Sequence, residues 1–201
     1  MYKIVTKREL APHINLFEFS AKEIAAKTKP GQFVILRVDE SGERIPLTIS
    51  GANVEKGTVV VVCHEVGKTT KQLGELKEGD RISDLLGPLG KPAEIEKFGA
   101  VLCVGGGVMA APLYFQAKAL HEAGNKVIGV IGARTKGHLI FEKEMREVCD
   151  EFHVATDDGT KGHKGLEFLE DLLKERKIDR TIVMGPIVTM RTVSEITHPH
   201  G

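Results

Sequence analysis

Three consecutive glycines, Gly105–Gly107, stand between a short apolar run and a helical pattern, and this arrangement constrains the fold most strongly. The apolar run, Ala100–Val104, lacks polar alternation, which is typical of a parallel strand covered on both faces. Together with Ala110 the glycines satisfy G-x-G-x-x-A, a turn in which glycine lets the backbone approach a pyrophosphate. Residues 100–134 therefore predict a strand, a glycine turn, a helix and a second strand, with a helix N-terminus suited to an anion.

The helix is expected over Ala111–Ala123 and carries Pro112 in its first turn, where the missing N–H would be unpaired in any case. The second strand is expected over Lys126–Ala133. Turns of this type usually have Asp or Glu at the end of the second strand, to hold a ribose. Arg134 stands there instead, and an ordinary tight turn of an α/β protein is the competing interpretation of the glycines.

Composition excludes several classes of protein. The chain has 201 residues, 41% of them hydrophobic and 28% charged, which is typical of a globular chain that buries a core. Its formal net charge is zero and it has no long basic run, so we expect no nucleic-acid partner. No apolar segment approaches the roughly 20 residues needed to span a bilayer, and no signal peptide is visible, so we expect a cytoplasmic protein.

The first half of the chain is a series of short strand-like runs separated by Gly and Pro turns. The expected strands are Tyr2–Leu10, Ile14–Ser20, Gln32–Val38, Arg44–Ser50, Thr58–Val66 and Arg81–Leu86. Only Lys68–Leu76 has a helical pattern. We therefore predict a six-stranded antiparallel β-barrel over residues 1–95.

The second half alternates strands and helices. After the glycine turn, we expect helices over Leu139–Val148, Gly165–Lys174 and Val188–Ile196, and strands over Glu151–Thr156 and Thr181–Met184. This alternation predicts a Rossmann-like, doubly wound parallel sheet over residues 96–201.

Two segments of the first half could hold a phosphate-bearing ligand. Arg44 supplies a planar fork for a pyrophosphate, although this segment alone favours a solvated arginine on an edge strand. In the second segment a strand ends at Gly67 and a helix begins with Thr69 and Thr70, so its first N–H groups form another anion site. A P-loop is excluded, because Val62 occupies the position of its first glycine.

The motifs RIPLTIS, EVGKTT, GPLG, GGGVMAAP and MGP occur in this order along essentially the whole chain. In this combination the chain resembles the ferredoxin–NADP reductase superfamily. Within it, the chain is similar to the electron-transfer subunits of dihydroorotate dehydrogenase and of NADH-dependent ferredoxin–NADP oxidoreductase, also called sulfide dehydrogenase. The segments RIPLTIS and GARTKGHLIFEKEM favour the second of these branches.

The resemblance implies FAD on the barrel and NAD(P) on the second domain. The implied flavin-binding residues are Arg44, Pro46, Leu47, Thr48, His64, Glu65, Val66, Gly67, Lys68, Thr69 and Thr70. The implied nucleotide-binding residues are Gly105, Gly106, Gly107, Val108, Ala110, Ala111, Pro112, Asp157, Asp158, Gly159, Met184, Gly185 and Pro186. Pro46 replaces an aromatic residue that often faces the flavin ring, and Met184 stands where relatives frequently have cysteine.

Two arguments about the preferred nicotinamide nucleotide conflict. Arg134, with Lys136, could accept the 2′-phosphate of NADP, because no acidic residue anchors the ribose. The resembled branch instead implies NAD(H), and we expect NAD.

The implied activity is hydride transfer from a reduced nicotinamide to a flavin, followed by electron transfer to a partner. The partner would be a larger flavoprotein or iron–sulfur subunit, or ferredoxin. No side chain needs to act as acid or base, so no catalytic residue is predicted. A free-standing ferredoxin or flavodoxin reductase and a non-catalytic NAD(P)-sensing subunit are the alternatives.

The resembled subunits continue beyond the last helix into a segment with four cysteines that hold a [2Fe–2S] cluster. Cys63, Cys103 and Cys149 are too widely spaced to replace those ligands, and no metal site is predicted. We therefore expect that the chain is truncated at its C-terminus and that a cluster belongs only to a missing segment. A short reductase that never had a cluster is the alternative.

Overall fold

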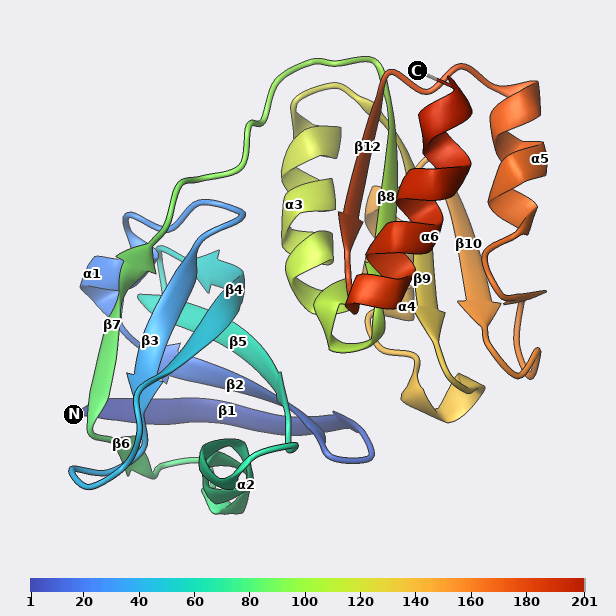
Figure 1. The fold of residues 1–201 in the computed structure, drawn as a ribbon. Helices are drawn as coiled ribbons and strands as arrows, with labels where there is room; N and C mark the ends of the chain where they lie inside the picture. The colour runs from blue at the N-terminus through green and yellow to red at the C-terminus, as the bar shows by residue number, and fades with distance from the viewer. Residues whose placement is uncertain (201) are drawn as a thin grey trace. The chain divides into compact units, whose positions relative to one another are not determined.

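The computed structural model describes residues 1–200, and the chain divides into two compact units, Met1–Glu94 and Ile95–Gly201. Each unit builds a sheet of its own (Figure 1). Within residues 1–200 no helix is both long and apolar enough to cross a membrane.

The first unit contains a seven-stranded antiparallel sheet with the order β6-β1-β2-β5-β4-β3-β7. Its strands are β1 (Tyr2–Ala11), β2 (Ile14–Ser20), β3 (Phe33–Arg37), β4 (Ile45–Asn53), β5 (Thr58–His64), β6 (Arg81–Ile82) and β7 (Asp84–Leu89). Two short helices, α1 (Lys22–Ala25) and α2 (Lys68–Glu75), interrupt the series of strands.

The two outermost strands, β6 and β7, are consecutive in the chain, so the sheet nearly closes into a barrel. β6 pairs with β1, whereas β7 pairs with β3, and the chain changes partner at Ser83. The Ser83 N–H donates to the Val38 carbonyl at 3.0 Å, which fixes this change of partner. The predicted antiparallel barrel is confirmed.

The number of strands in the barrel was predicted wrongly, because it has seven strands and not six. The single strand expected over Arg81–Leu86 is two strands, β6 and β7. A run of extended residues carries no local signal for the point at which its hydrogen-bonding partner changes, since pairing depends on distant strands.

Apolar side chains from alternating positions fill the barrel. Phe17 and Phe19 of β2 are fully buried, and their ring centroids lie 6.1 Å apart. Ile4 and Ile49 join them from β1 and β4, and α2 buries Leu73 completely. Each fully buried side chain of this size contributes about 1.5–3 kcal/mol to folding, so α2 is held to the barrel mainly by Leu73.

The second unit is a five-stranded parallel sheet with the order β11-β10-β9-β8-β12. Its strands are β8 (Ala100–Gly106), β9 (Lys126–Ala133), β10 (Glu151–Thr156), β11 (His163–Lys164) and β12 (Arg180–Met184). Its α-helices are α3 (Ala110–Glu122), α4 (Glu142–Val148), α5 (Phe168–Glu175) and α6 (Ile187–Thr197), and short 3₁₀ turns span Gly107–Met109, Lys136–His138 and His198–His200.

Helices lie on both faces of the parallel sheet (Figure 1). On one face, α5 and α6 pack against Leu102 and Val104 of β8 and against β9. On the other face, Met145 of α4 lies over Gly129 of β9, where a Cβ would lie 3.0 Å from Met145 Cε. The predicted doubly wound parallel sheet is therefore confirmed.

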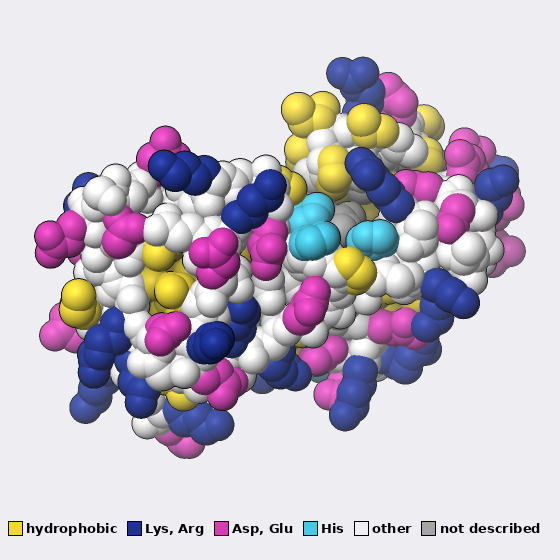
Figure 2. Space-filling view, turned by 90° about the horizontal axis from the view of Figure 1, so that it is seen from below, with side chains coloured by type: hydrophobic (Ala, Val, Ile, Leu, Met, Phe, Trp, Pro, Cys, Tyr) yellow, Lys and Arg dark blue, Asp and Glu magenta, His cyan; other side chains and the backbone are white. Residues whose placement is uncertain are grey.

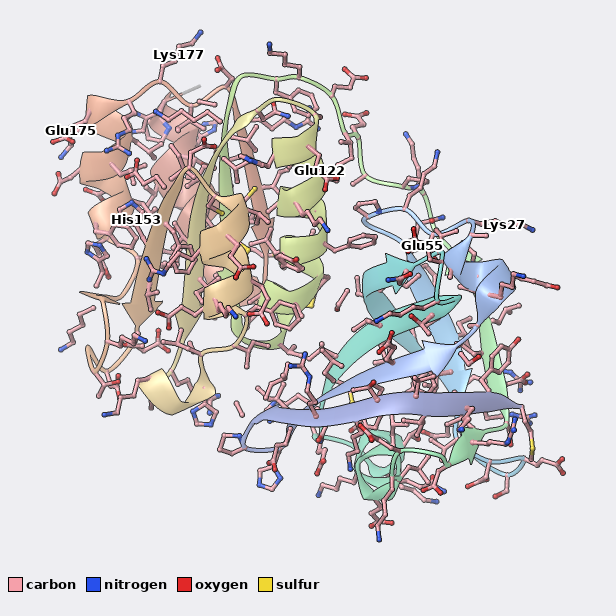
Figure 3. All side chains as sticks on the ribbon, turned by 180° about the vertical axis from the view of Figure 1, so that it is seen from behind. Lys27, Glu55, Glu122, His153, Glu175 and Lys177 are labelled. Carbon is pink, nitrogen blue, oxygen red and sulfur yellow. The ribbon has the colours of Figure 1, made fainter. Side chains whose placement is uncertain are left out.

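The outer edge of this sheet differs from the prediction. β11 was not expected, and α4 begins at Glu142 because Phe141 has a left-handed φ of 60°. His153 of β10 (Figure 3) packs near His163 of β11, whose ring stacks on Phe168 at 3.8 Å. Desolvation, with a smaller effect of His153, lowers the pKa of His163 and so favours its neutral form.

Basic and acidic side chains are interspersed on the face of the molecule shown in Figure 2. This distribution agrees with the formal net charge of zero. Any binding site for an anion must therefore come from local geometry and not from an overall positive field.

Candidate cofactor-binding sites

The glycines at the end of β8 meet two separate requirements of the turn. A Cβ on Gly105 would lie 2.8 Å from Leu113 Cδ2 and 3.1 Å from Ala110 Cα, so glycine lets α3 pack closely on the strand. Gly107 has a left-handed φ of 58°, and a Cβ there would meet nothing within 4 Å. The backbone at Gly107 is therefore open to a ligand.

Gly106 faces the turn that follows β12. A Cβ on Gly106 would lie 3.2 Å from Pro186 Cδ and from Thr189 Oγ1, and one on Gly185 would lie 3.3 Å from Gly106 Cα. The structure thus packs the two predicted motifs, GGG and MGP, backbone against backbone. They meet where the strand order reverses about β8, which is where doubly wound sheets bind ligands. Met184, the last residue of β12, is half-buried beside them.

Helix α3 begins beside this crevice. It continues from the 3₁₀ turn Gly107–Met109, and the Ala110 N–H donates to the Gly107 carbonyl, so the N–H groups left for an anion lie at the start of that turn and not in α3 itself. Val108 is half-buried, whereas Ala110, Ala111 and Pro112 are buried. Contact with a phosphate would therefore come from the backbone of this segment and not from its side chains.

The turns after β9 and β10 lie together at the same end of the sheet. The Asp158 N–H donates to the Arg134 carbonyl at 3.2 Å. Asp158 Oδ1 accepts a hydrogen bond from the Thr160 hydroxyl at 2.6 Å, and this bond lowers the pKa of the carboxyl group. Arg134 and residues 157–159 are all exposed. The predicted residues of the two turns are thus brought together, and the Asp158 carboxylate lies in the turn that adjoins Arg134.

In the barrel, Arg44 immediately precedes β4 and belongs to a charged cluster. Its Nη2 donates to Asp84 Oδ2 at 2.8 Å, and Arg37 Nη2 lies 3.3 Å from the same oxygen. Two guanidinium groups share one carboxylate, so one positive charge of the cluster is uncompensated. The Arg44 side chain is 56% exposed and keeps N–H groups that can bind a phosphate.

Pro46, Leu47 and Thr48 lie in the part of β4 that has a partner strand on one side only. This part pairs with β3, where Thr48 lies opposite Phe33, whereas β5 pairs with β4 only from Ile49 onward. Proline is tolerated there because one edge of the strand lacks a ladder. The same free edge exposes backbone groups at the three residues for which the family resemblance implies a contact with the flavin.

The segment after β5 places its side chains on two sides. His64 and Val66 are exposed, Val66 to 73%. The Glu65 carboxylate instead accepts a hydrogen bond from Asn15 Nδ2 at 2.5 Å, so it contacts the barrel. Only the backbone of Glu65 is left for the predicted contact with a cofactor.

Helix α2 follows this segment directly. The Thr70 hydroxyl closes its first turn by accepting from the Gly67 N–H at 3.0 Å, while Lys68 is exposed and Thr69 is buried. A pocket of about 350 Å³ lies beside this turn, lined by Asp39, Ser41, Gly42, Glu43, Lys68, Thr69, Lys71, Gln72 and Glu75. This pocket joins the start of α2 to Glu43, the neighbour of Arg44, so the two predicted phosphate-binding segments adjoin one space.

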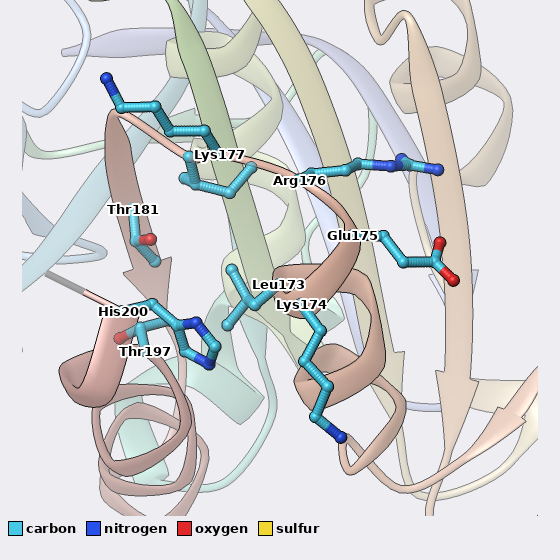
Figure 4. Close-up of a pocket in the computed structure, with 9 residues that line it drawn as sticks. Leu173, Lys174, Glu175, Arg176, Lys177, Thr181, Thr197 and His200 are labelled. Carbon is cyan, nitrogen blue, oxygen red and sulfur yellow. The ribbon is translucent and has the colours of Figure 1, made fainter.

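Another pocket, of about 340 Å³, lies at the opposite end of the parallel sheet (Figure 4). Leu173–Ile178, Thr181, Thr197 and His200 line it. Because β12 runs from Arg180 to Met184, Thr181 marks its amino end. Nucleotides bind at the carboxyl ends of such strands, so this pocket is separate from the glycine turns.

Two residues of these sites were missed in the sequence. Asp84 orients Arg44 from another strand, and nothing near it in sequence signals that contact. Thr189, which would contact a Cβ on Gly106, lies in the first turn of α6. A hydroxyl residue in the helix turn that follows MGP is a local signal that could have identified it.

The cysteines do not form a redox or metal site. Cys63 and Cys103 are buried and Cys149 is half-buried. Burial raises the pKa of Cys63 and of Cys149 to about 12, so both thiols are protonated at neutral pH. Within residues 1–200 no group of three or more His, Cys, Asp or Glu residues is arranged to hold a metal ion.

Comparison with known proteins identifies relatives over nearly the whole chain, although no protein-family model matches it. The chain is 46% identical to a homologue of the dihydroorotate dehydrogenase B (NAD(+)) electron transfer subunit from Thermotoga maritima, covering 94% of this chain and 67% of that protein. It is 33% identical to the dihydroorotate dehydrogenase B (NAD(+)) electron transfer subunit of Desulforamulus reducens, over 96% and 75% of the two chains.

Among solved structures, the NADH-dependent reduced ferredoxin–NADP oxidoreductase, described in connection with flavin-based electron bifurcation, matches with a TM-score of 0.92 and 43% identity. That match covers 98% of this chain and 72% of the solved chain. Both halves of the predicted fold, and the predicted resemblance, are therefore confirmed. The chain belongs to the family of electron transfer subunits of the dihydroorotate dehydrogenase B type.

Proposed function

We propose that the chain is an FAD-containing subunit that oxidises NADH and passes the electrons to a partner redox protein or subunit. The first unit holds FAD, and the second unit holds the nicotinamide nucleotide. The names of the relatives support this proposal, since they describe NAD(+)-linked electron transfer subunits and an NADH-dependent oxidoreductase. A larger flavoprotein subunit, an iron–sulfur subunit or ferredoxin would receive the electrons.

The observation that carries the proposal is that each unit has its own helical N-terminus that follows a strand and a glycine. In the first unit, a pocket adjoins both the first turn of α2 and the segment of Arg44. In the second unit, the open backbone at Gly107 begins the 3₁₀ turn that precedes α3. Two separate phosphate sites fit two cofactors, a flavin dinucleotide and a pyridine dinucleotide, better than a single nucleotide.

When bound, a flavin accepts a hydride from reduced nicotinamide and releases electrons singly. The residues of this chain bind and orient. Arg44 and the N–H groups of α2 hold the flavin phosphates, while the free edge of β4 at Pro46–Thr48 borders the ring. The turns at Gly105–Gly107 and Met184–Pro186 hold the nicotinamide nucleotide. No proton transfer by a side chain is required.

The test is reconstitution of the purified chain with FAD, followed by assay of NADH oxidation with an artificial electron acceptor. We expect one FAD per chain, visible by its absorbance after gel filtration, and NADH-dependent reduction of the acceptor. A chain that binds NADH but no flavin would be a nucleotide sensor and would refute the proposal. Reduction of ferredoxin by the chain alone would identify ferredoxin as the direct partner.

A further inference from the structure

Gly74 lies in the last turn of α2. Glycine destabilises a helix, and the helical conformation at this position does not need glycine. Its φ is not positive, so the backbone alone does not require glycine. A Cβ on Gly74 would lie 2.5 Å from Glu65 Cδ and 3.1 Å from Glu65 Cγ. The Glu65 carboxylate occupies the space that any other side chain at position 74 would need.

The Glu65 side chain is held in this place. Asn15, which is only 3% exposed, donates from Nδ2 to Glu65 Oε1 at 2.5 Å. His13 Nδ1 lies 3.6 Å from Glu65 Oε2, and the Glu65 N–H donates to the His13 carbonyl at 2.9 Å. Because the carboxylate has a buried donor, it cannot turn away to make room without leaving that donor unpaired.

Gly74 is also held through its carbonyl group, which accepts a hydrogen bond from Lys7 Nζ of β1. An ammonium group at the C-terminus of a helix is favoured by the helix dipole. The preceding residue, Leu73, is fully buried in the barrel. The Lys7 hydrogen bond, the burial of Leu73 and the close approach of Glu65 to Gly74 therefore fix the last turn of α2.

A helix of eight residues is stiff, so contacts that fix its last turn also set the direction of its first turn. The first turn, at Gly67–Thr70, supplies the N–H groups that the flavin phosphates need. We infer that Glu65 and Gly74 are positioning residues that aim the N-terminus of α2 at the pyrophosphate of FAD. This inference rests on the proposed function, because it requires FAD in the first unit.

The experiment compares the affinities of FAD and riboflavin for the full chain and its variants, by quenching of flavin fluorescence. We expect Gly74→Ala and Glu65→Ala each to turn the N-terminus of α2 away from the FAD pyrophosphate. The loss of one charge-assisted contact between α2 and the pyrophosphate should weaken FAD binding about tenfold, whereas riboflavin, which has no pyrophosphate, should bind as before. Glu65→Gln should restore FAD affinity to within about twofold, since its amide oxygen can accept the same Asn15 hydrogen bond. Gly51→Ala is the control, because a Cβ there would lie 3.7 Å from Val60 Cβ, an ordinary contact.

Each outcome separates the positioning role from its alternatives. Equal FAD affinities of the wild type and both alanine variants would overturn the inference but leave the proposed function intact. A loss of the same size for riboflavin and FAD would show a general loosening of the barrel, which also overturns it. If Gly74→Ala does not fold, as judged by circular dichroism, Glu65→Ala provides the same comparison. Absence of FAD binding by the wild type would overturn both proposals.

Discussion

The contact of Arg44 with Asp84 changes the interpretation of this residue more than any local pattern does. Its sequence segment alone favours a solvated arginine on an edge strand. Asp84 fixes one of its terminal nitrogens, and Arg37 shares that carboxylate, so the guanidinium is oriented without being neutralised. An oriented guanidinium with a remaining positive charge is suited to bidentate binding of phosphate oxygens. The local motif makes Arg44 a candidate, whereas the way its side chain is held depends on Asp84 of β7, which is distant in the sequence.

Replacing Arg44 by alanine should therefore lower the FAD content of the purified protein. Loss of one charge-assisted contact predicts roughly tenfold weaker FAD binding, measured by titration of the flavin-free protein. Arg8→Ala removes an exposed arginine of β1 and is the matched control, for which no change is expected. Unchanged FAD affinity of the Arg44 variant would exclude this residue from the flavin site.

Among the elements, those predicted best have a strong local pattern. The strand at Ile14–Ser20 and the helix after the glycines were predicted from periodicity alone, because alternation and helical spacing are properties of neighbouring residues. The split at Ser83 and the edge strand at His163–Lys164 were not predicted, because each depends on a distant pairing partner. The same division holds for the sites. Glycine turns and helix starts could be predicted, whereas the contact of Glu65 with Gly74 brings together parts of the chain that no local pattern connects.

The turns after β9 and β10 together predict the preferred nucleotide. The ionised Asp158 lies in the turn whose N–H binds the Arg134 carbonyl, and Asp157 adds a second carboxylate. Negative charge beside the ribose disfavours a 2′-phosphate, so we expect kcat/KM for NADH to exceed that for NADPH at least about tenfold. Asp158→Asn should narrow this ratio, whereas Asp171→Asn, in the exposed face of α5, should not. A preference of the wild type for NADPH would assign Arg134 to the 2′-phosphate instead.

The chain as a whole consists of two compact units, each with its own core. Phe17, Phe19 and Leu73 belong to the barrel, whereas Leu102, Val104 and the helices α5 and α6 build the core of the parallel sheet. A change confined to the nucleotide site should therefore leave the flavin site folded and loaded. This independence allows binding of the two cofactors to be tested separately in one polypeptide.

Gly107→Val tests that independence directly. The variant places a branched side chain at a left-handed φ of 58° and fills the open space above the glycine turn. We expect FAD content equal to that of the wild type and reduction of the bound flavin by NADH slowed about a hundredfold, because the nucleotide phosphates can no longer approach the backbone. Reduction of the same protein by dithionite, which needs no nucleotide site, should proceed at the wild-type rate. Stopped-flow measurement of flavin absorbance distinguishes the two reductants. Loss of FAD from the variant, or rapid reduction by NADH, would show that the two sites are not divided between the units in this way.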